Sequence, residues 1–222
     1  MSLELPTNHV PAAGGPAGGR TAEWHRAVRF TKQLSWVSLV WMCAEGAIGL
    51  ASGVAAGSVS LVGWGLASFV EGVAAVIVIW RFTGSRALSD TAELRAQKLV
   101  AISLFLLAPY LIAESLRDII AGHHATASTL GIAITASSVV VMPLLGRTKR
   151  RLGRTLGSPA TAGEGAQNLL CAAQAAIVLL SMTLIAISPS LWFFDPAAAG
   201  FIAYVAIREG RDAWRGESCE CC

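Results

Sequence analysis

The sequence predicts an all-α membrane protein, a bundle of six transmembrane helices with both termini in the cytoplasm. The first observation behind this prediction is composition: 54% of the 222 residues are hydrophobic and only 14% are charged, whereas charged residues make up about 25% of an average soluble domain. The second is a series of apolar runs, each near the ~20 residues that a spanning helix needs. The third is the placement of the basic residues, which gather in alternate links between the runs.

Six apolar runs are expected to form one spanning helix each. They cover residues 34–56, 58–80, 99–121, 127–145, 165–187 and 192–207. Gly49 and Gly53 share a face of the first helix and favour close contact with another helix. Pro109 is expected to kink the third helix. Asp195 before Pro196 is typical of a helix start, here that of the sixth helix.

The chain divides into a tail, a membrane domain and a second, shorter tail. Residues 1–30 are expected to form a disordered cytoplasmic tail, because Gly, Pro and Ala dominate residues 12–19. The amphipathic run 24–30 leads into the first helix and is expected to lie at the membrane interface. Residues 31–208 then form the transmembrane domain, and residues 209–222 form a short cytoplasmic tail that contains cysteines.

Nearly all basic residues fall on one side of the predicted arrangement. All but Arg117 of the 17 Lys and Arg lie before the first run, between the second and third, between the fourth and fifth, or after the sixth. Because cytoplasmic loops carry the excess of Lys and Arg, this pattern predicts cytoplasmic termini. We expect an integral protein of the plasma (inner) membrane, surrounded by the lipid bilayer.

Glu71 is the only charged residue inside the second run. At ~1.5 Å per residue it lies about 16 Å along the helix from Ser60, near the middle of a ~30 Å hydrocarbon core. A charge at this depth costs at least ~2.5 kcal/mol and normally faces a partner, a cavity or an ion. We therefore expect Glu71 to lie on an ion path.

Other polar residues inside the predicted helices are candidates to join Glu71. Glu45 lies at a similar depth in the first run, and Glu164, Gln167 and Cys171 open the fifth. Carboxylate, thiolate and amide groups together suit a divalent transition metal. Structural interpretations remain open: Glu164 as a first-turn carboxylate on the helix dipole, and Gln167 as a hydrogen bond between helices. Cys171 also suits a small core position, and Glu45 a pairing with a neighbouring helix.

Short motifs along the chain carry a resemblance to a known family. They are Glu45-Gly46, Ser58-Val59-Ser60-Leu61, the paired positions Ala67 and Glu71, the paired positions Gln167 and Cys171 with Glu164 ahead of them, Asp195-Pro196, and Arg208-Glu209-Gly210-Arg211-Asp212-Ala213-Trp214-Arg215-Gly216. Together they resemble the transmembrane domain of the cation diffusion facilitator (cation efflux) family. The resemblance covers residues 34–208 and is to a short branch, for which we expect no cytosolic metal-binding domain.

The resemblance implies a function and a set of ligands. The implied function is export of a divalent metal ion, zinc-like, from the cytoplasm by alternating access, with proton coupling. The implied metal ligands are Glu71, Cys171 and Gln167, completed by Glu164, Glu45 or water. The metal ion is the transported substrate, and no resident cofactor is expected.

The same positions also motivate an alternative. The typical site of the family has four His or Asp residues, whereas Ala67 cannot ligate a metal. The alternative is a non-transporting membrane protein on a degenerate efflux scaffold, which binds a metal or a partner. No nucleophile–base pair or phosphate-binding Gly loop is evident in the sequence, so we expect no enzyme. The net charge of +3 is modest and the basic residues report topology, so we expect no nucleic-acid partner. A symmetric homodimer is the expected oligomer.

Cysteines cluster at the end of the chain. Cys219, Cys221 and Cys222 form a cytoplasmic thiol group that is a candidate for capturing a soft metal and passing it to the transport site. S-palmitoylation close to the membrane and an unstructured end without a role are the alternatives.

Overall fold

The computed structural model describes residues 22–81, 90–156 and 158–215, and these form helices without a strand. The helices are α1 (Ala22–Ala56), α2 (Val59–Arg81), α3 (Asp90–Ala121), α4 (Thr129–Leu156), α5 (Pro159–Ile187), the short 3-10 helix η2 (Pro189–Leu191) and α6 (Phe194–Arg215). The predicted all-α class is confirmed.

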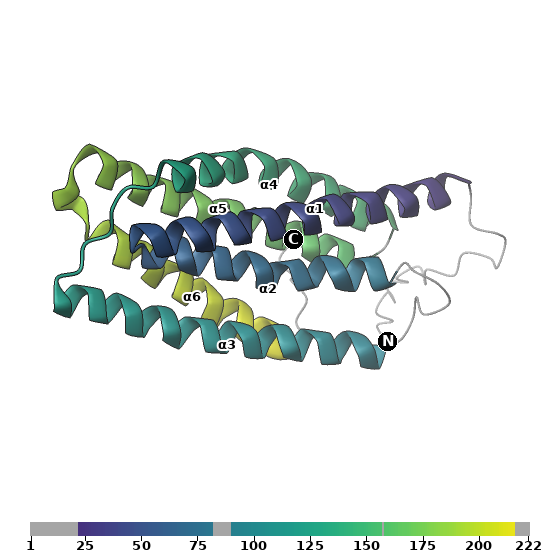
Figure 1. Cartoon of the computed structure of the whole chain (residues 1–222). Coiled ribbons are helices and arrows are strands. Elements are labelled where there is room, and N and C mark those ends of the chain that lie inside the picture. The colour runs from purple at the N-terminus through teal and green to yellow at the C-terminus, as the bar shows by residue number, and fades with distance from the viewer. Residues whose placement is uncertain (1–21, 82–89, 157, 216–222) are drawn as a thin grey trace, which may run out of the picture.

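Successive helices run in opposite directions along one elongated bundle (Figure 1). The start of α1 and the end of α6 lie toward the same end of the bundle, together with the end of α2 and the start of α5. We call this the basic end, because the exposed side chains of Arg26, Arg151 and Arg211 lie there. The turns that join α1 to α2, α3 to α4 and α5 to α6 lie at the opposite end, which we call the far end.

Among the described residues, four segments are long and apolar enough to cross a membrane. They are Arg26–Ala56, Thr129–Leu156, Thr161–Ile187 and Pro189–Asp212, and Val59–Val73 is a shorter apolar helix. Large apolar side chains such as Leu106 (68% exposed) and Ile120 (84% exposed) point outward, as expected for a surface in contact with lipid. These features support an integral membrane protein, while the full set of six spans stays a prediction.

In the described part of the chain, the interior of the bundle has two apolar clusters. The larger one joins α2, α3, α5 and α6 through side chains such as Trp64, Leu111 and Ile202, none of which is exposed. The smaller one joins α1, α4 and α5 through Met42, Met142 and Cys171. Some of the buried polar residues, among them Glu45, Ser68 and Ser138, lie beside the smaller cluster, where α1, α2, α4 and α5 meet.

Glycines allow α1 and α2 to pack closely, as the sequence predicts. A Cβ atom on Gly53 would lie 2.7 Å from the backbone nitrogen of Val62, and one on Gly49 would lie 3.1 Å from the Trp64 ring. Real Cβ atoms rarely approach another atom so closely, so larger residues would push α1 and α2 apart. The close-contact role of Gly49 and Gly53 is therefore confirmed.

The helices begin and end differently from the apolar runs. The first helix starts at Ala22, so residues 22–30, which we expected in the disordered tail, are helical; residues 1–21 of that tail lie outside the described residues. The fourth helix continues to Leu156, well past its apolar run. Hydropathy shows where a helix leaves the apolar part of the membrane. It does not show where the backbone hydrogen bonds of the helix end, because Ala, Lys and Arg also form helices in water.

Candidate functional site

Glu45 is the centre of a hydrogen-bond network inside the bundle. Its side chain is completely buried. Oε2 accepts hydrogen bonds from Trp41 Nε1 at 2.7 Å and from Ser138 Oγ, and Oε1 accepts from Ser68 Oγ at 3.0 Å and Cys171 Sγ at 3.3 Å. These donors come from α1, α4, α2 and α5. One carboxyl group thus ties four helices together, and the structural interpretation of Glu45 as a partner of neighbouring helices is confirmed.

Glu71 lies beside this network, but one of its carboxyl oxygens has no hydrogen-bond donor. The residue is only 4% exposed, and its Oε2 atom accepts no hydrogen bond. The Cys171 thiol lies beside the Glu71 carboxyl group as well as that of Glu45, and the two carboxyl groups interact electrostatically. Glu71 is therefore one of the buried polar groups of this region, together with Asn168 and Gln174, that lack a full set of partners.

A small cavity adjoins Glu71 on the side of α5 and α6. It has a volume of about 10 Å³, and its polar lining consists of Glu71, Gln167, Gln174 and Glu209. Such a volume holds about one water molecule. Ala67 also lines the cavity, so this residue, which cannot ligate a metal, faces the same space as Glu71.

The structure brings some of the predicted ligands together and separates others. Glu45, Glu71 and Cys171 meet between the helices, and Gln167 lines the cavity beside Glu71. Among the described residues, however, no group of three or more His, Cys, Asp and Glu side chains is placed to hold one metal ion. In addition, both oxygens of Glu45 already accept hydrogen bonds from protein donors.

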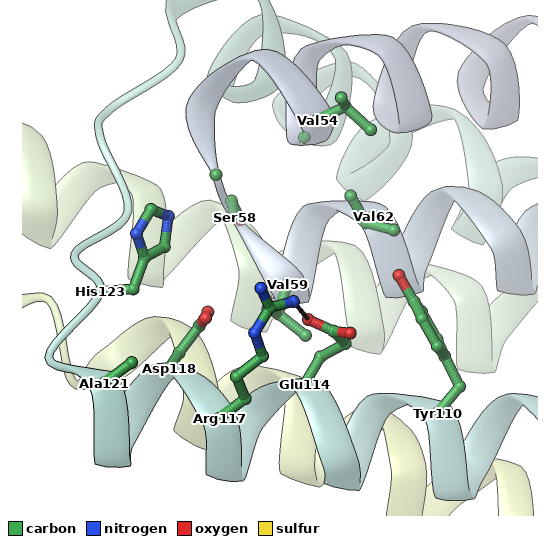
Figure 2. Close-up of a pocket in the computed structure, with 12 residues that line it drawn as sticks. Val54, Ser58, Val59, Val62, Tyr110, Glu114, Arg117, Asp118, Ala121 and His123 are labelled. Carbon is green, nitrogen blue, oxygen red and sulfur yellow. Dashed lines mark hydrogen bonds and ion pairs between the residues drawn. The ribbon is translucent and has the colours of Figure 1, made fainter.

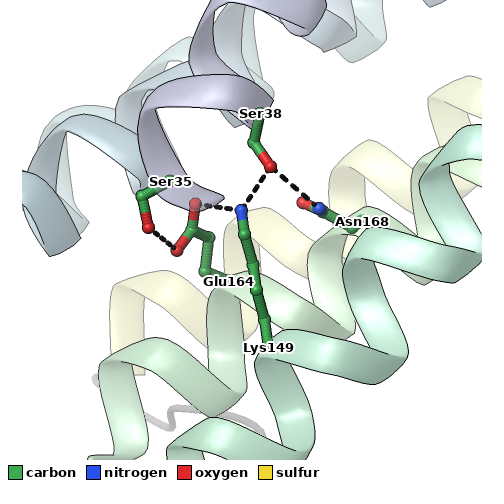
Figure 3. Close-up of polar contacts among 5 residues, drawn as sticks. All are labelled: Ser35, Ser38, Lys149, Glu164 and Asn168. Atoms are coloured by element: carbon green, nitrogen blue, oxygen red, sulfur yellow. Dashed lines mark hydrogen bonds and ion pairs between the residues drawn. The ribbon is translucent and has the colours of Figure 1, made fainter. Parts of the chain in front are cut away.

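Glu164 belongs to a separate network nearer the basic end (Figure 3). Lys149 of α4 donates to Glu164 Oε1 and to Ser38 Oγ, and Ser35 Oγ donates to Glu164 Oε2 at 2.8 Å. Asn168 Nδ2 lies 3.4 Å from Ser38 Oγ. Both oxygens of Glu164 are therefore occupied by protein donors rather than free to bind a metal.

Lys149 is the residue of this region that the sequence interpretation missed. It lies between the fourth and fifth apolar runs, among the basic residues predicted to face the cytoplasm, yet its side chain is completely buried. The signal lies in the spacing of the buried face of α4, which passes through Met142, Leu145, Lys149 and Gly153 at intervals of three and four residues. A helical pattern of this kind places Lys149 on the inner face.

Asp195 joins the far ends of α6 and α2. Its Oδ2 atom accepts from the backbone nitrogens of Val59 at 2.8 Å and Ser60 at 3.3 Å, and Oδ1 accepts from the hydroxyl groups of Ser58 and Ser60. Asp195 lies in the first turn of α6 as predicted. Its carboxylate nevertheless caps the first turn of α2, a partner about 135 residues away that local patterns cannot reveal.

A larger cavity opens at the far end between α3 and the turn that joins α1 to α2 (Figure 2). Its volume is about 280 Å³. Glu114 and Arg117 form an ion pair of 3.3 Å at its wall, while Asp118 and His123 lie nearby along the same rim. The lining thus carries two carboxylates, of which that of Glu114 is already paired with Arg117.

Comparison with models of known protein families finds none that matches the chain. The resemblance to cation diffusion facilitators therefore stays a prediction. The proposed metal-capture residues Cys219, Cys221 and Cys222 lie outside the described residues.

Proposed function

We propose that this protein carries a divalent metal cation across a membrane by alternating access. The observation that supports this proposal most directly is the unpaired Oε2 atom of Glu71. An acceptor buried without a donor costs about 1–3 kcal/mol, more if it is charged. Buried ionisable groups in membrane bundles usually mark the path of a substrate or ion, and a cation is the partner that an unpaired carboxylate oxygen lacks.

Neighbouring groups add to the case for a metal. Cys171 donates to Glu45 and lies beside Glu71, so a thiol adjoins each of the two carboxyl groups, although the three are not arranged around one point. Binding a metal there requires these ligands to lose their protons, which couples metal uptake to proton release. Proton-coupled exchange is therefore part of the proposal.

The distribution of charge between the two ends of the bundle supports a direction of transport. Basic residues gather at one end, which the positive-inside rule assigns to the cytoplasm. The far end carries the cavity with Glu114 and Asp118. We propose export from the cytoplasm through the plasma membrane, with cytoplasmic termini and a zinc-like ion as the substrate that the family resemblance suggests.

The test is metal flux into liposomes that contain a metal-sensitive dye, with and without a pH gradient. We expect flux from the parent protein and at least about a tenfold loss in Glu71→Gln, since a ligand supports both binding and transport. Cys171→Ser should also reduce flux, whereas Cys43→Ser, at an exposed position of α1, should not. Normal flux in Glu71→Gln would refute the assignment of this site.

A second candidate function is metal or partner binding without transport. Two observations favour it: Ala67 supplies no ligand to the cavity, and the described residues contain no group of three acidic, thiol or imidazole side chains around one point. Metal binding by purified protein that produces no flux for a panel of divalent metals would favour this function over transport.

A further inference from the structure

A pocket lies on the outer face of α6, toward the basic end. Its volume is about 180 Å³, and it is lined by Tyr204, Ile207, Arg208, Arg211, Asp212 and Arg215. Because these residues recur with helical spacing, they form one stripe along α6. The buried residues Ile202 and Ala206 lie on another face of the helix, where they line the cavity beside Glu71. The pocket is therefore separate from the candidate metal site.

The lining of the pocket changes from apolar to basic along the helix. Tyr204 is 61% exposed and Ile207 is 37% exposed, and the three exposed arginines follow toward the basic end. The segment Pro189–Asp212 is apolar and long enough to cross a membrane, so the arginines lie around its end. Trp214, which is also exposed, lies in the same turn as the last arginine. Exposed tyrosine and tryptophan side chains are typical of the level of the lipid headgroups, so the pocket spans the boundary between acyl chains and headgroups.

The guanidinium groups of the pocket keep their donors for a ligand. Within the described part of the chain, none of the three arginines forms an ion pair with a carboxylate. Side chains three or four positions apart on a helix have Cβ atoms about 5–6 Å apart, so Arg211 adjoins both Arg208 and Arg215. A guanidinium group binds phosphate through two parallel hydrogen bonds. Two neighbouring arginines of this stripe can therefore hold one phosphate group between them.

We propose that this pocket binds the phosphate group of an anionic phospholipid. The phosphate lies between Arg211 and its arginine neighbours, and an acyl chain lies along Tyr204 and Ile207. Three arginines and one aspartate line the pocket, and the resulting excess of positive charge is complementary to an anionic headgroup. The apolar part of the lining favours a lipid over a soluble phosphate compound, which has no chain to cover it. The inference does not depend on transport and requires only that the protein lies in a membrane.

Arginines at this position also have two simpler roles. They interact favourably with the C-terminal end of the helix dipole, and their long side chains reach from the apolar region to water. Both roles act alike in every lipid, whereas a phosphate site depends on the headgroup. Asp212 gives a second distinction, because its carboxylate lines the pocket and repels a phosphate. Removing the charge of Asp212 should therefore strengthen lipid binding.

The test is native mass spectrometry of the purified full-length protein in detergent, titrated with phosphatidylglycerol or phosphatidylcholine. We expect the parent to bind phosphatidylglycerol more tightly. Arg211→Gln should weaken this binding by about fivefold, the effect of one basic residue near an anionic membrane surface. The double variant Arg208→Gln/Arg211→Gln should weaken it by about 25-fold if the two contributions add. Asp212→Asn should strengthen it, and glycerol 3-phosphate, the soluble headgroup, should not displace the lipid.

The matched control is Arg147→Gln/Arg151→Gln, which removes two charges from exposed positions of α4 at the same end of the bundle. Its affinity for phosphatidylglycerol should equal that of the parent. An equal loss in this control and in Arg208→Gln/Arg211→Gln would mean a general attraction of anionic lipid to the basic end, and would overturn the inference. Equal affinities of the parent for the two lipids would overturn it too. Displacement of the lipid by glycerol 3-phosphate would make the ligand a soluble phosphate compound instead, and weaker binding in Asp212→Asn would contradict the placement of the phosphate.

Discussion

Lys149 of α4 and Glu164 of α5 form an ion pair in which the two side chains are 0% and 1% exposed (Figure 3). Removing such charges from water costs several kcal/mol per ion, which the pair recovers only with good geometry and further hydrogen bonds. Ser35 and Ser38 of α1 supply those bonds. The ion pair therefore holds three helices together near the basic end.

Lys149→Met should destabilise the protein strongly, because it leaves the Glu164 carboxylate buried without its cation. The expected loss in the free energy of unfolding is about 3–5 kcal/mol, the usual result of removing one partner of a buried pair. Denaturant titration of the protein in detergent micelles measures it.

Two further variants distinguish the loss of the ion pair from a general effect of removing a charge. Arg151→Met, at an exposed position of the same helix, should change the stability by less than about 0.5 kcal/mol. The double variant Lys149→Met/Glu164→Gln should recover most of the loss, because removing both charges of a buried pair is often close to neutral. Equal losses in Lys149→Met and Arg151→Met would contradict the role given to the pair.

Asp195→Ala should detach the far end of α6 from the start of α2. The change removes the acceptor of the Val59 and Ser60 backbone N–H groups and of the Ser58 hydroxyl. Loss of an ordinary helix cap costs about 1 kcal/mol, and a buried donor left without an acceptor adds about 1–3 kcal/mol. We expect a loss larger than that of a simple cap, measured as a lower midpoint of thermal unfolding.

The conservative variant Asp195→Asn keeps one side-chain acceptor, so its midpoint should fall between those of the parent and Asp195→Ala. Ser137→Ala, which removes an exposed hydroxyl from α4, serves as the control. If Asp195→Asn and Asp195→Ala have the same midpoint as this control, the cap contributes nothing to stability.

The helices of this protein were predictable because each one corresponds to a continuous apolar run. The same reasoning identified Glu45 and Glu71 as costly groups, since a charge in an apolar run is visible locally. Their partners were not predictable. Ser138 and Cys171 lie 93 and 126 residues from Glu45, and the sequence does not state which helix faces contact each other.

Polar side chains near the helix ends show a second limit of prediction from the sequence. The sequence places Lys149 among exposed basic neighbours and Asp195 at a helix start, and both local descriptions are accurate. Each side chain nevertheless bonds to a different helix, because tertiary packing decides where a long or polar side chain finds its partner. Helical spacing would have indicated the burial of Lys149, although not its pairing with Glu164.

Gly165→Ala should separate α4 from α5. A Cβ atom at this position would lie 2.7 Å from the carbonyl oxygen of Gly146 and 2.8 Å from the backbone nitrogen of Arg150. Backbone atoms cannot move aside as the end of a flexible side chain can, so we expect a loss of about 1–3 kcal/mol from overpacking. Denaturant titration in micelles measures this loss too.

Gly163, two residues earlier in α5, provides a matched control for this substitution. Nothing lies within 4 Å of the position that its Cβ would occupy. Gly163→Ala should therefore stabilise the helix by about 0.5–1 kcal/mol, the usual gain from replacing glycine in a helix interior. A gain of stability in Gly165→Ala as well would show that α4 and α5 do not pack as closely as described.

The orientation of α5 in the membrane gives the last prediction. Cysteine is introduced at Ser190, in the far-end turn, or at Arg151, near the basic end, in a chain whose Cys219, Cys221 and Cys222 are replaced by serine. Cytoplasmic termini predict that an impermeant maleimide labels Ser190→Cys in intact cells and Arg151→Cys only after permeabilisation. The remaining Cys171 is buried, and Cys43 lies within the apolar segment Arg26–Ala56, so the reagent should reach neither. The opposite labelling pattern would mean that the protein has the opposite orientation in the membrane, and the proposed direction of transport would then be import. Labelling of both positions in intact cells would mean that α5, the helix between them, does not cross the membrane.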